Sequence, residues 1–266
     1  MMKKNIKKVL CKSLLNKSGI LDYCINPYTG CEHGCVYCYA RFMKRYSNHR
    51  EEWGDFVDIK VNAADILKKQ LEKARKGEIF ISSVTDAYQP IEKKTELTRN
   101  ILKELLNYQF PITIQTKSSL VLRDIDLLKK FKDCEVGFTV TCFDEDSINF
   151  EPNASSTEER LRALKILKEE GIKTYIFFGP ILPFISTKNL NKLFDEFKTA
   201  DHILIDKLNI KCGNWPKIEK VIKSKYPDLL DRYKEIFFTD NDYYEKLRKE
   251  IIKLCIKRKI KYEFIY

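Results

Sequence analysis

Short runs of β-branched and aromatic residues alternate along the chain with longer segments that carry apolar residues at helical spacing. The short runs predict strands over residues 22–27, 78–83, 112–116, 135–141, 174–178 and 202–208. The longer segments predict helices over residues 63–75, 95–108, 123–131, 157–170 and 188–198. Repeated β–α units with nearly continuous apolar strands predict an α/β fold with a parallel sheet and right-handed crossovers. Six such units form either an open doubly wound sheet or an incomplete barrel.

The alternation ends after Leu208. From Lys217 onward the pattern predicts two or three helices and a short terminal strand over residues 261–265. No repeat, low-complexity tract or linker in the sequence requires a second domain. We therefore expect one domain over residues 1–266, with a core at about 20–210 and a helical C-terminal extension at about 211–266.

Composition places the chain among globular proteins. Apolar residues make up 44% of the sequence and charged residues 33%, a balance that disordered chains lack. The longest apolar stretch, residues 175–185, is broken by glycine and proline, and a membrane-spanning helix needs about 20 apolar residues. The basic segment of residues 1–17 lacks the apolar core and cleavage site of a signal peptide. We expect a cytoplasmic protein without a membrane partner.

The formal net charge of +11 allows two interpretations. A basic balance is typical of proteins that bind nucleic acid. Lysine and glutamate are, however, scattered along the predicted helices, as on the Lys-rich solvated surface of some thermophilic proteins. Nucleic acid is therefore one candidate partner, and the charge alone does not select it.

Three of the nine cysteines lie in one short loop. Cys31, Cys35 and Cys38 follow the first predicted strand, with three and then two residues between them. Because a reducing cytosol disfavours disulfides, clustered cysteines indicate metal binding or catalysis. Thiolates this close in sequence can reach three corners of one iron–sulfur cube and leave the fourth iron without a protein ligand. An open coordination position is typical of a catalytic metal site.

A structural zinc site is the alternative interpretation of the same loop. It would use the three cysteines with His33 or a more distant ligand. Zinc sites usually present paired Cys-x-x-Cys knuckles, and the sequence has no second knuckle. The corresponding function is that of a non-catalytic, zinc-containing nucleic-acid-binding protein.

The spacing Cys31-x-x-x-Cys35-x-x-Cys38 resembles the signature of the radical S-adenosylmethionine (SAM) superfamily. The resemblance implies that the three thiolates bind a [4Fe–4S] cluster and that the methionine part of SAM chelates the open iron. It implies an external one-electron donor, cleavage of SAM to a 5′-deoxyadenosyl radical, and hydrogen abstraction from a substrate. The protein would orient the cofactors and exclude water from the radical. Tyr39, the aromatic residue after the last cysteine, would pack beside the adenine.

Further segments, from about Tyr23 to Leu208, resemble the spore photolyase-related branch of that superfamily. They comprise residues 82–92, 97–99, 116–117, 150–152, 159–161 and 179–180. These motifs fall at the carboxyl ends of predicted strands, where the loops of barrel enzymes build active sites. The resemblance therefore implies an incomplete parallel (β/α)6 barrel, a partial TIM barrel, rather than an open sheet.

The same resemblance implies roles for individual residues. Thr85 would contact the amino-acid part of SAM, and Lys117 would reach its carboxylate or ribose. Thr139 or Thr141 would contact the ribose side. Gly179 would let the backbone approach the adenine.

Three charged residues in these motifs have structural alternatives. Asp86 is assigned to cofactor binding, although an aspartate in a turn can also cap it. Glu151 can favour the start of a helix through the helix dipole. Arg160 is expected to pair with a nearby carboxylate on the surface.

True spore photolyases have a hydrogen-donating cysteine on the second strand, and the matching residue here is Ser83. A hydroxyl O–H bond is too strong to return hydrogen readily to a substrate radical, so thymine-dimer repair is not the expected reaction. Cys142 and Cys212, after the fourth and sixth predicted strands, are candidate thiols, although a free cysteine usually packs as a small apolar residue. Tyr88 is a candidate radical relay. The sequence thus predicts a radical SAM enzyme whose substrate is a nucleic acid, a peptide or a small molecule.

Overall fold

The computed structural model describes residues 4–266, so the first three residues of the basic N-terminal segment lie outside the described residues. An eight-stranded sheet with the order β11-β10-β9-β8-β7-β6-β3-β2 dominates the described part. Its strands are β2 (Leu15–Lys17), β3 (Tyr23–Ile25), β6 (Ile79–Ile81), β7 (Ile112–Thr116), β8 (Cys134–Val140), β9 (Lys173–Ile181), β10 (His202–Lys207) and β11 (Tyr262–Phe264). β2 is antiparallel to β3, and the other neighbours are parallel. The predicted α/β class is confirmed.

The six predicted strands of the core correspond to β3 and to β6 through β10, and the predicted terminal strand corresponds to β11. The bounds differ from those predicted only at the strand ends, where assignments are least certain. Each of the six core strands pairs with the next of the six along the chain, an order that repeated β–α units allow. The edge strands β2 and β11 do not pair with each other in the described residues, so their hydrogen bonds do not close the sheet.

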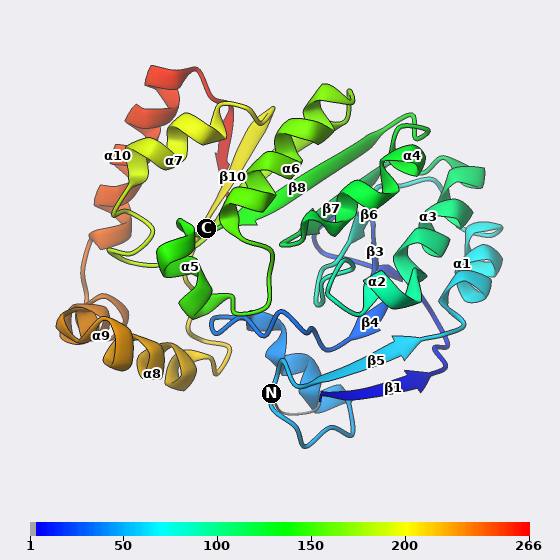
Figure 1. Cartoon of the computed structure of the whole chain (residues 1–266), viewed down its shortest axis with the longest axis horizontal. Coiled ribbons are helices and arrows are strands. Elements are labelled where there is room, and N and C mark those ends of the chain that lie inside the picture. Colours follow the sequence, from blue (N-terminus) through cyan, green and yellow to red (C-terminus); the bar gives the residue numbers. More distant parts are fainter. Residues whose placement is uncertain (1–3) are drawn as a thin grey trace.

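Helices connect the parallel strands (Figure 1). They are α1 (Ala63–Leu71), α2 (Glu92–Thr95), α3 (Leu97–Tyr108), α4 (Ile125–Leu128), α5 (Asp144–Phe150), α6 (Thr157–Glu169) and α7 (Leu190–Phe197), with the 3-10 helices η1 (Tyr39–Tyr46) and η2 (Ser119–Asp124). The C-terminal part adds α8 (Trp215–Lys225), η3 (Pro227–Leu229), α9 (Leu230–Phe238) and α10 (Tyr243–Arg258), which lie together at one end of the molecule. The extension is therefore helical, as predicted; its separation from the core within one domain stays a prediction.

Two predicted helices differ from the structure for local reasons. The helix predicted over residues 95–108 begins two residues later, at Leu97, because Glu96 takes a left-handed conformation with φ of 47° and separates α3 from the short α2, which ends at Thr95. The helix predicted over residues 123–131 starts as the 3-10 helix η2 and continues as the short α4. Helix α5 was not predicted, since its 7 residues, about two turns, are too short for a clear helical pattern.

The two faces of the main sheet differ in chemistry because successive side chains of a strand point in opposite directions. Ile114, Val136 and Phe178 belong to one face and are fully buried in the hydrophobic core. The residues between them on the strands form a more polar inner face. There Gln115 bonds to Thr139 and to the hydroxyl of Tyr175, with distances of 3.3 and 3.2 Å. A polar inner face is suited to hold polar ligands near the carboxyl ends of the strands.

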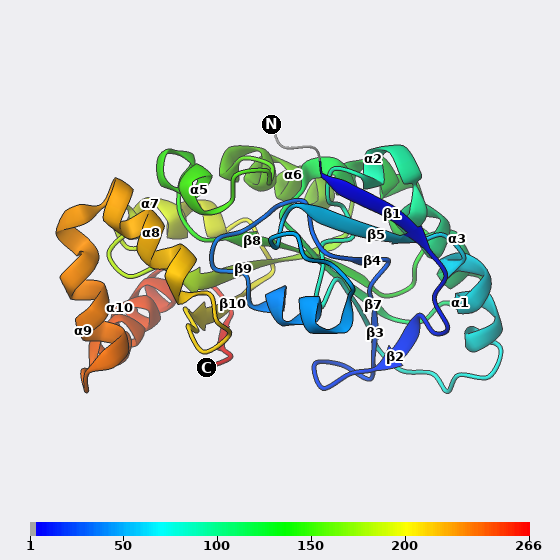
Figure 2. The same cartoon turned by 90° about the horizontal axis from the view of Figure 1, so that it is seen from below.

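A second, three-stranded sheet was not predicted. It contains β1 (Asn5–Val9), β5 (Phe56–Lys60) and β4 (Tyr28–Thr29) in the order β1-β5-β4, with β5 in the centre. Its central strand carries apolar residues that are buried, including Phe56 and Val57. Figure 2 shows this sheet beside the main sheet. Because β4 ends directly before the cysteine loop, the small sheet fixes where that loop begins.

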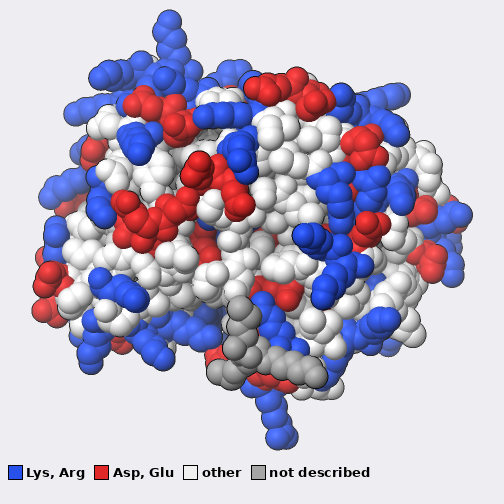
Figure 3. Space-filling view, in the orientation of Figure 1, with Lys and Arg blue, Asp and Glu red and all other residues white. Residues whose placement is uncertain are grey.

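Two bulk properties bear on the partners of the protein. No helix within residues 4–266 has the length and apolar character needed to cross a bilayer. On the face shown in Figure 3, lysine and arginine side chains alternate with acidic ones and do not form one continuous basic patch. This face therefore offers no continuous basic patch of the kind that binds nucleic acid.

Candidate active site

The three clustered cysteines lie in a buried loop between β4 and η1. Cys31 and Cys35 are buried and Cys38 is half-buried, and all three are free thiols. The loop is tightly turned, because the N–H of Cys38 donates a hydrogen bond of 3.2 Å to the carbonyl of Cys35. Gly30 precedes the loop with φ of +87°, and a Cβ there would stand 2.4 Å from the carbonyl oxygen of Phe56. Glycine is therefore needed at the point where the loop leaves the small sheet.

The thiols are close enough to influence one another electrostatically. Burial and the nearby charges of Asp86, Cys35 and Cys38 raise the pKa of Cys31. Burial also raises the pKa of Cys35, to about 12, although the ammonium group of Lys117 opposes the shift. Without a metal these groups are therefore neutral thiols, and metal binding would have to release their protons.

The donor set suits a thiolate-ligated cluster better than a single metal ion. Within residues 4–266, no three His, Cys, Asp or Glu side chains converge closely enough to hold one metal ion. Sulfur ligands of one zinc ion stand about 2.3 Å from the metal and therefore close together. Thiolates that bind separate irons of a cube stand farther apart, so the same finding does not count against a cluster. Three soft donors beside the cation of Lys117 fit an anionic iron–sulfur group.

The loop that follows β6 supports the cysteine loop. The Thr85 hydroxyl donates a hydrogen bond of 2.6 Å to the carbonyl of Gly30. The Gln89 carbonyl accepts one of 2.8 Å from the N–H of Glu32, and its amide donates one of 3.0 Å to Thr85. Thr85 thus lies beside the start of the cysteine loop, and its hydroxyl is engaged with the loop backbone. Its predicted contact with SAM stays a prediction.

Asp86 joins three parts of the site. Its carboxylate accepts hydrogen bonds from the Thr116 hydroxyl (2.7 Å) and the Lys117 N–H (2.8 Å), and lies 3.3 Å from Nδ1 of His33. Burial opposes ionisation, but the charge of His33 and these hydrogen bonds lower the pKa of Asp86 to about 2. Each oxygen of the carboxylate already accepts from protein groups, including the N–H of Tyr88. The contacts match the structural alternative, a turn cap, more closely than cofactor binding.

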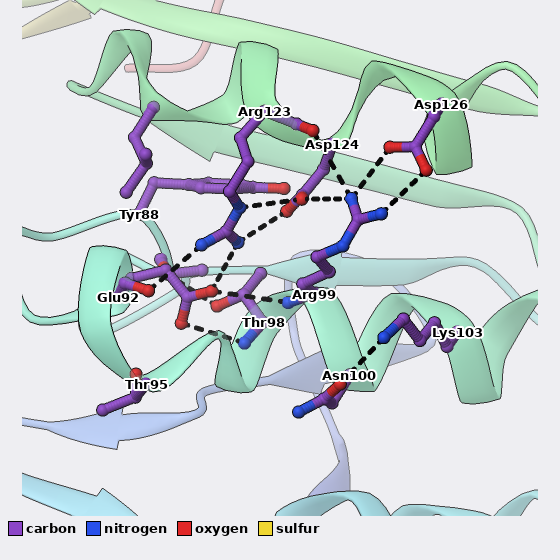
Figure 4. A network of polar contacts seen from close by, with 12 residues as sticks. Tyr88, Glu92, Thr95, Thr98, Arg99, Asn100, Lys103, Arg123, Asp124 and Asp126 are labelled. Carbon is purple, nitrogen blue, oxygen red and sulfur yellow. Dashed lines mark hydrogen bonds and ion pairs between the residues drawn. The ribbon is translucent and has the colours of Figure 1, made fainter.

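A polar network anchors the far end of the same loop (Figure 4). The carboxylate of Glu92 is fully buried and accepts hydrogen bonds from Arg123 (2.6 Å), the N–H of Thr98 (2.9 Å) and the hydroxyl of Tyr28. Arg123 also bonds to Asp124 at 2.8 Å. Since Tyr28 lies on β4, just before the cysteine loop, Glu92 ties that loop to α3 and η2. Sequence reasoning gave this network no role, because its members are far apart along the chain.

A second buried network lies at the opposite side of the cysteine loop. Arg160 was expected on the surface, but its side chain is only 1% exposed, and this expectation is corrected. Its predicted carboxylate partner exists: Nη2 of Arg160 lies 2.5 Å from Oε2 of Glu151. Glu151 follows α5 and also accepts a hydrogen bond from the hydroxyl of Tyr37, inside the cysteine loop. Its role is therefore to bind Arg160 and Tyr37, not to start a helix.

The remaining predicted cofactor residues lie around the carboxyl ends of the strands. Lys117 directly follows β7, and its Nζ lies 5.8 Å from the ring centre of Tyr37. Thr139 and Thr141 are buried at the end of β8, where the Thr141 hydroxyl donates to Glu151 at 3.2 Å. Tyr39 is 49% exposed and its hydroxyl donates to the carbonyl of Ser83. The structure thus brings these residues together with the cysteines, and their contacts with SAM stay predictions.

Gly179 on β9 has an unpredicted neighbour. A Cβ at Gly179 would lie 3.1 Å from the Cβ of Asp206, on the adjacent strand β10. Burial raises the pKa of Asp206 to about 6, and its carboxylate has no ion-pair partner among the described residues. Its charge also acts on Tyr39, so the two side chains are near each other. An alternating polar position at the end of a predicted strand was the available signal for this residue.

The candidate redox residues have different surroundings. Cys142 is buried in an apolar cluster with Phe150, and burial raises the pKa of its thiol to about 12. Cys212 is half-buried and close enough to Tyr39 for their charges to interact. Tyr88 is fully buried with its hydroxyl beside Asp124 (Figure 4). This position gives a radical relay through Tyr88 no support, while Cys212 lies in the vicinity of the proposed cofactor site.

Comparison with known proteins agrees with this geometry. Residues 25–197 match the family model described as the radical SAM superfamily. An uncharacterized protein of Methanocaldococcus jannaschii is 47% identical over 227 residues, which are 84% of each chain. A radical SAM Nα-GlyT isomerase of Pseudomonas phage M6 is 26% identical over 224 residues, which cover 81% of this chain and 45% of the isomerase.

Solved structures share the fold at low sequence identity. A mutant spore photoproduct lyase with bound AdoMet and dinucleoside spore photoproduct has a TM-score of 0.63 and 18% identity, covering 88% of this chain and 79% of that chain. SuiB of Streptococcus suis bound to S-adenosylmethionine has a TM-score of 0.56 and 15% identity, covering 99% of this chain and 51% of that chain. At these identities the likeness describes the fold alone.

Proposed function

This chain belongs to the radical SAM superfamily, and we propose that it holds a [4Fe–4S] cluster on Cys31, Cys35 and Cys38 and cleaves SAM reductively there. One observation carries the proposal: three free thiols, two buried and one half-buried, share a loop beside Lys117, at the carboxyl ends of parallel strands. The sheet would form an incomplete (β/α)6 barrel around this site. The bound cluster and SAM would supply the radical chemistry.

The residues of the chain would orient the cofactors and keep water out. Lys117 offers a half-buried ammonium group at the edge of the site, suited to a carboxylate. Burial opposes its charge, but the acidic groups around it, Cys35, Glu151 and Asp86, raise its pKa, so it remains a cation. Tyr39 offers an exposed ring directly after the last cysteine, suited to stack on a base. Both functions follow from the family and stay proposals for this chain.

Anaerobic reconstitution with iron and sulfide tests the proposal. We expect a brown protein with about four irons per chain, which cleaves SAM to methionine and 5′-deoxyadenosine under dithionite. Replacing the three loop cysteines by alanine should abolish iron uptake and cleavage. Replacing Cys134 and Cys255, which are buried in the main core, should leave both intact. A colourless protein with one tightly bound zinc would favour the zinc-containing nucleic-acid-binding alternative.

The substrate requires a separate experiment. A solved structure of spore photoproduct lyase is a complex with a dinucleoside spore photoproduct, and the net charge of this chain is +11, so we propose nucleic acid as the first substrate to test. Binding of DNA and RNA should weaken linearly in the logarithm of the salt concentration, since phosphate contacts release counterions. Binding that does not change with salt concentration in this range would exclude nucleic acid as the substrate. Deuterium transfer from labelled lysate fractions into 5′-deoxyadenosine would then identify the molecule that gives up hydrogen.

A further inference from the structure

The ion pair between Glu151 and Arg160 is shielded from solvent on all sides. Side-chain exposure is 1% for each partner. Arg160 donates from Nη1 to the carbonyl of Thr139 at 2.7 Å, and Glu151 accepts from Arg160, Tyr37 and Thr141. Replacing such a pair by apolar residues of similar volume is often neutral or stabilising, because both charges must leave water. Stability alone is therefore a weak reason for two full charges at this position.

The location of the pair suggests a different reason. Tyr37, which donates its hydroxyl to Glu151, lies between Cys35 and Cys38 in the chain. The N–H of Val36, the residue after Cys35, donates to the carbonyl of Phe150 at 2.8 Å, so Glu151, the residue after Phe150, lies close to this part of the loop. The Tyr37 hydroxyl is the donor in this contact, because an ionised carboxylate can only accept. The pair thus holds the middle of the cysteine loop and places one anion and one cation beside a thiol.

We propose that Glu151, Arg160 and Tyr37 form a positioning device that fixes the segment from Cys35 to Cys38 and sets the reduction potential of the cluster bound there. The inference rests on the proposed function, since it requires a cluster on this loop. Reduction adds an electron to a group that already carries three thiolate charges. A nearby cation lowers the cost of that electron and a nearby anion raises it, and net charge is among the factors that set cluster potentials.

The balance of charges defines the direction of the effect. Lys117 and Arg160 are the cations near Cys35, and Glu151 is the anion. Neutralising Glu151 leaves two cations beside the cluster and should favour its reduced form. Removing only the Tyr37 hydroxyl keeps all charges but releases the loop from Glu151. Neutralising Glu151 should therefore change the reduction potential of the cluster. Removing the Tyr37 hydroxyl should mainly lower the amount of cluster that the protein retains.

The test compares three variants of the full chain after anaerobic reconstitution, by iron content and by redox titration followed with electron paramagnetic resonance. Glu151→Gln should bind iron and show a midpoint potential higher than wild type. Tyr37→Phe should lose part of its iron while its remaining cluster has a potential nearer to that of wild type. Glu135→Gln is the matched control, because Glu135 is a largely buried carboxylate at the start of β8, at the opposite end of that strand from Thr139 and the ion pair.

The outcomes separate this inference from the proposed function. If Glu151→Gln and Glu135→Gln have the same potential and Tyr37→Phe keeps all its iron, the inference is overturned while the proposed function stands. If Glu151→Gln does not fold, Tyr37→Phe decides, since it retains the ion pair: full iron content and a wild-type potential would overturn the inference. A wild-type chain that takes up no iron overturns the proposed function itself.

Discussion

Gln89 and Glu32, which are 57 positions apart, are joined by a buried hydrogen bond: Oε1 of Gln89 accepts from the N–H of Glu32 at 2.8 Å. The carboxylate of Glu32 in turn accepts from the N–H of Ile91. The loop that contains the three cysteines and the loop that follows β6 therefore hold each other in place. A substitution that disturbs one loop should therefore also disturb the other.

Gln89→Met should destabilise the protein and weaken the cysteine site. The substitution leaves the buried N–H of Glu32 without an acceptor, which costs about 1–3 kcal/mol in the free energy of unfolding. We expect less iron per chain after reconstitution. Gln109→Met is the control, because Gln109 bonds to the carbonyls of Leu106 and Lys130, outside the site. It should lose stability but not iron; equal iron loss in both variants would contradict a specific role for Gln89.

Gly137→Ala should destabilise the fold by steric conflict. A Cβ at this position would stand 2.0 Å from the ring of Tyr175, on the neighbouring strand β9. Overpacking of this kind typically costs about 1–3 kcal/mol, which a chemical denaturation curve measures. Gly19→Ala is the control, since a Cβ there meets no atom within 4 Å and should change the stability by less than about 0.5 kcal/mol. Two equally stable variants would show that the ring does not cover Gly137.

Glu92→Gln should cost much of the stability that the buried network provides. The carboxylate compensates Arg123 and accepts from Tyr28, so its neutralisation leaves a largely buried cation with one fewer anion. Breaking a buried pair in this way costs about 3 kcal/mol. Asp126→Asn should have little effect, because Asp126 is an exposed partner of Arg99. Thermal unfolding of both variants measures the difference, and similar losses would contradict the importance of burial.

The unfolding free energy should depend on pH through Asp206. Burial raises the pKa of this carboxyl from its ordinary value of 3.8 to about 6, so the folded state keeps a proton that the unfolded chain releases. Stability from this group is fully present below about pH 4 and is lost as pH rises through about 6. The Asp206→Asn variant lacks this loss. The free energy of unfolding of the variant, relative to that of wild type, should therefore increase as the pH rises from about 4 to about 6. Solvent screening of the partly exposed side chain reduces the effect. If the unfolding free energies of the two proteins change with pH in parallel, Asp206 makes no such contribution.

Local patterns in the sequence determined the repeating elements and the chemistry of the cysteine loop. The apolar runs of β7 and β8 and the helical spacing of α6 are properties of neighbouring residues, so each could be recognised without knowing the fold. The spacing of Cys31, Cys35 and Cys38 likewise depends only on the chain itself. The connection rules for repeated β–α units allowed both an open doubly wound sheet and an incomplete barrel, so the consecutive order of the parallel strands was decided by the structure.

Only the tertiary structure decided which distant side chains meet. The sequence does not show that Gln89 binds the backbone of Glu32, or that Arg160 is buried against Glu151 instead of lying on the surface. The small sheet was also missed, because β4 and β5 are short and gain their stability from pairing with each other and from packing near the cysteine loop. Long-range hydrogen bonds and burial depend on how whole elements dock, and no local period encodes that arrangement.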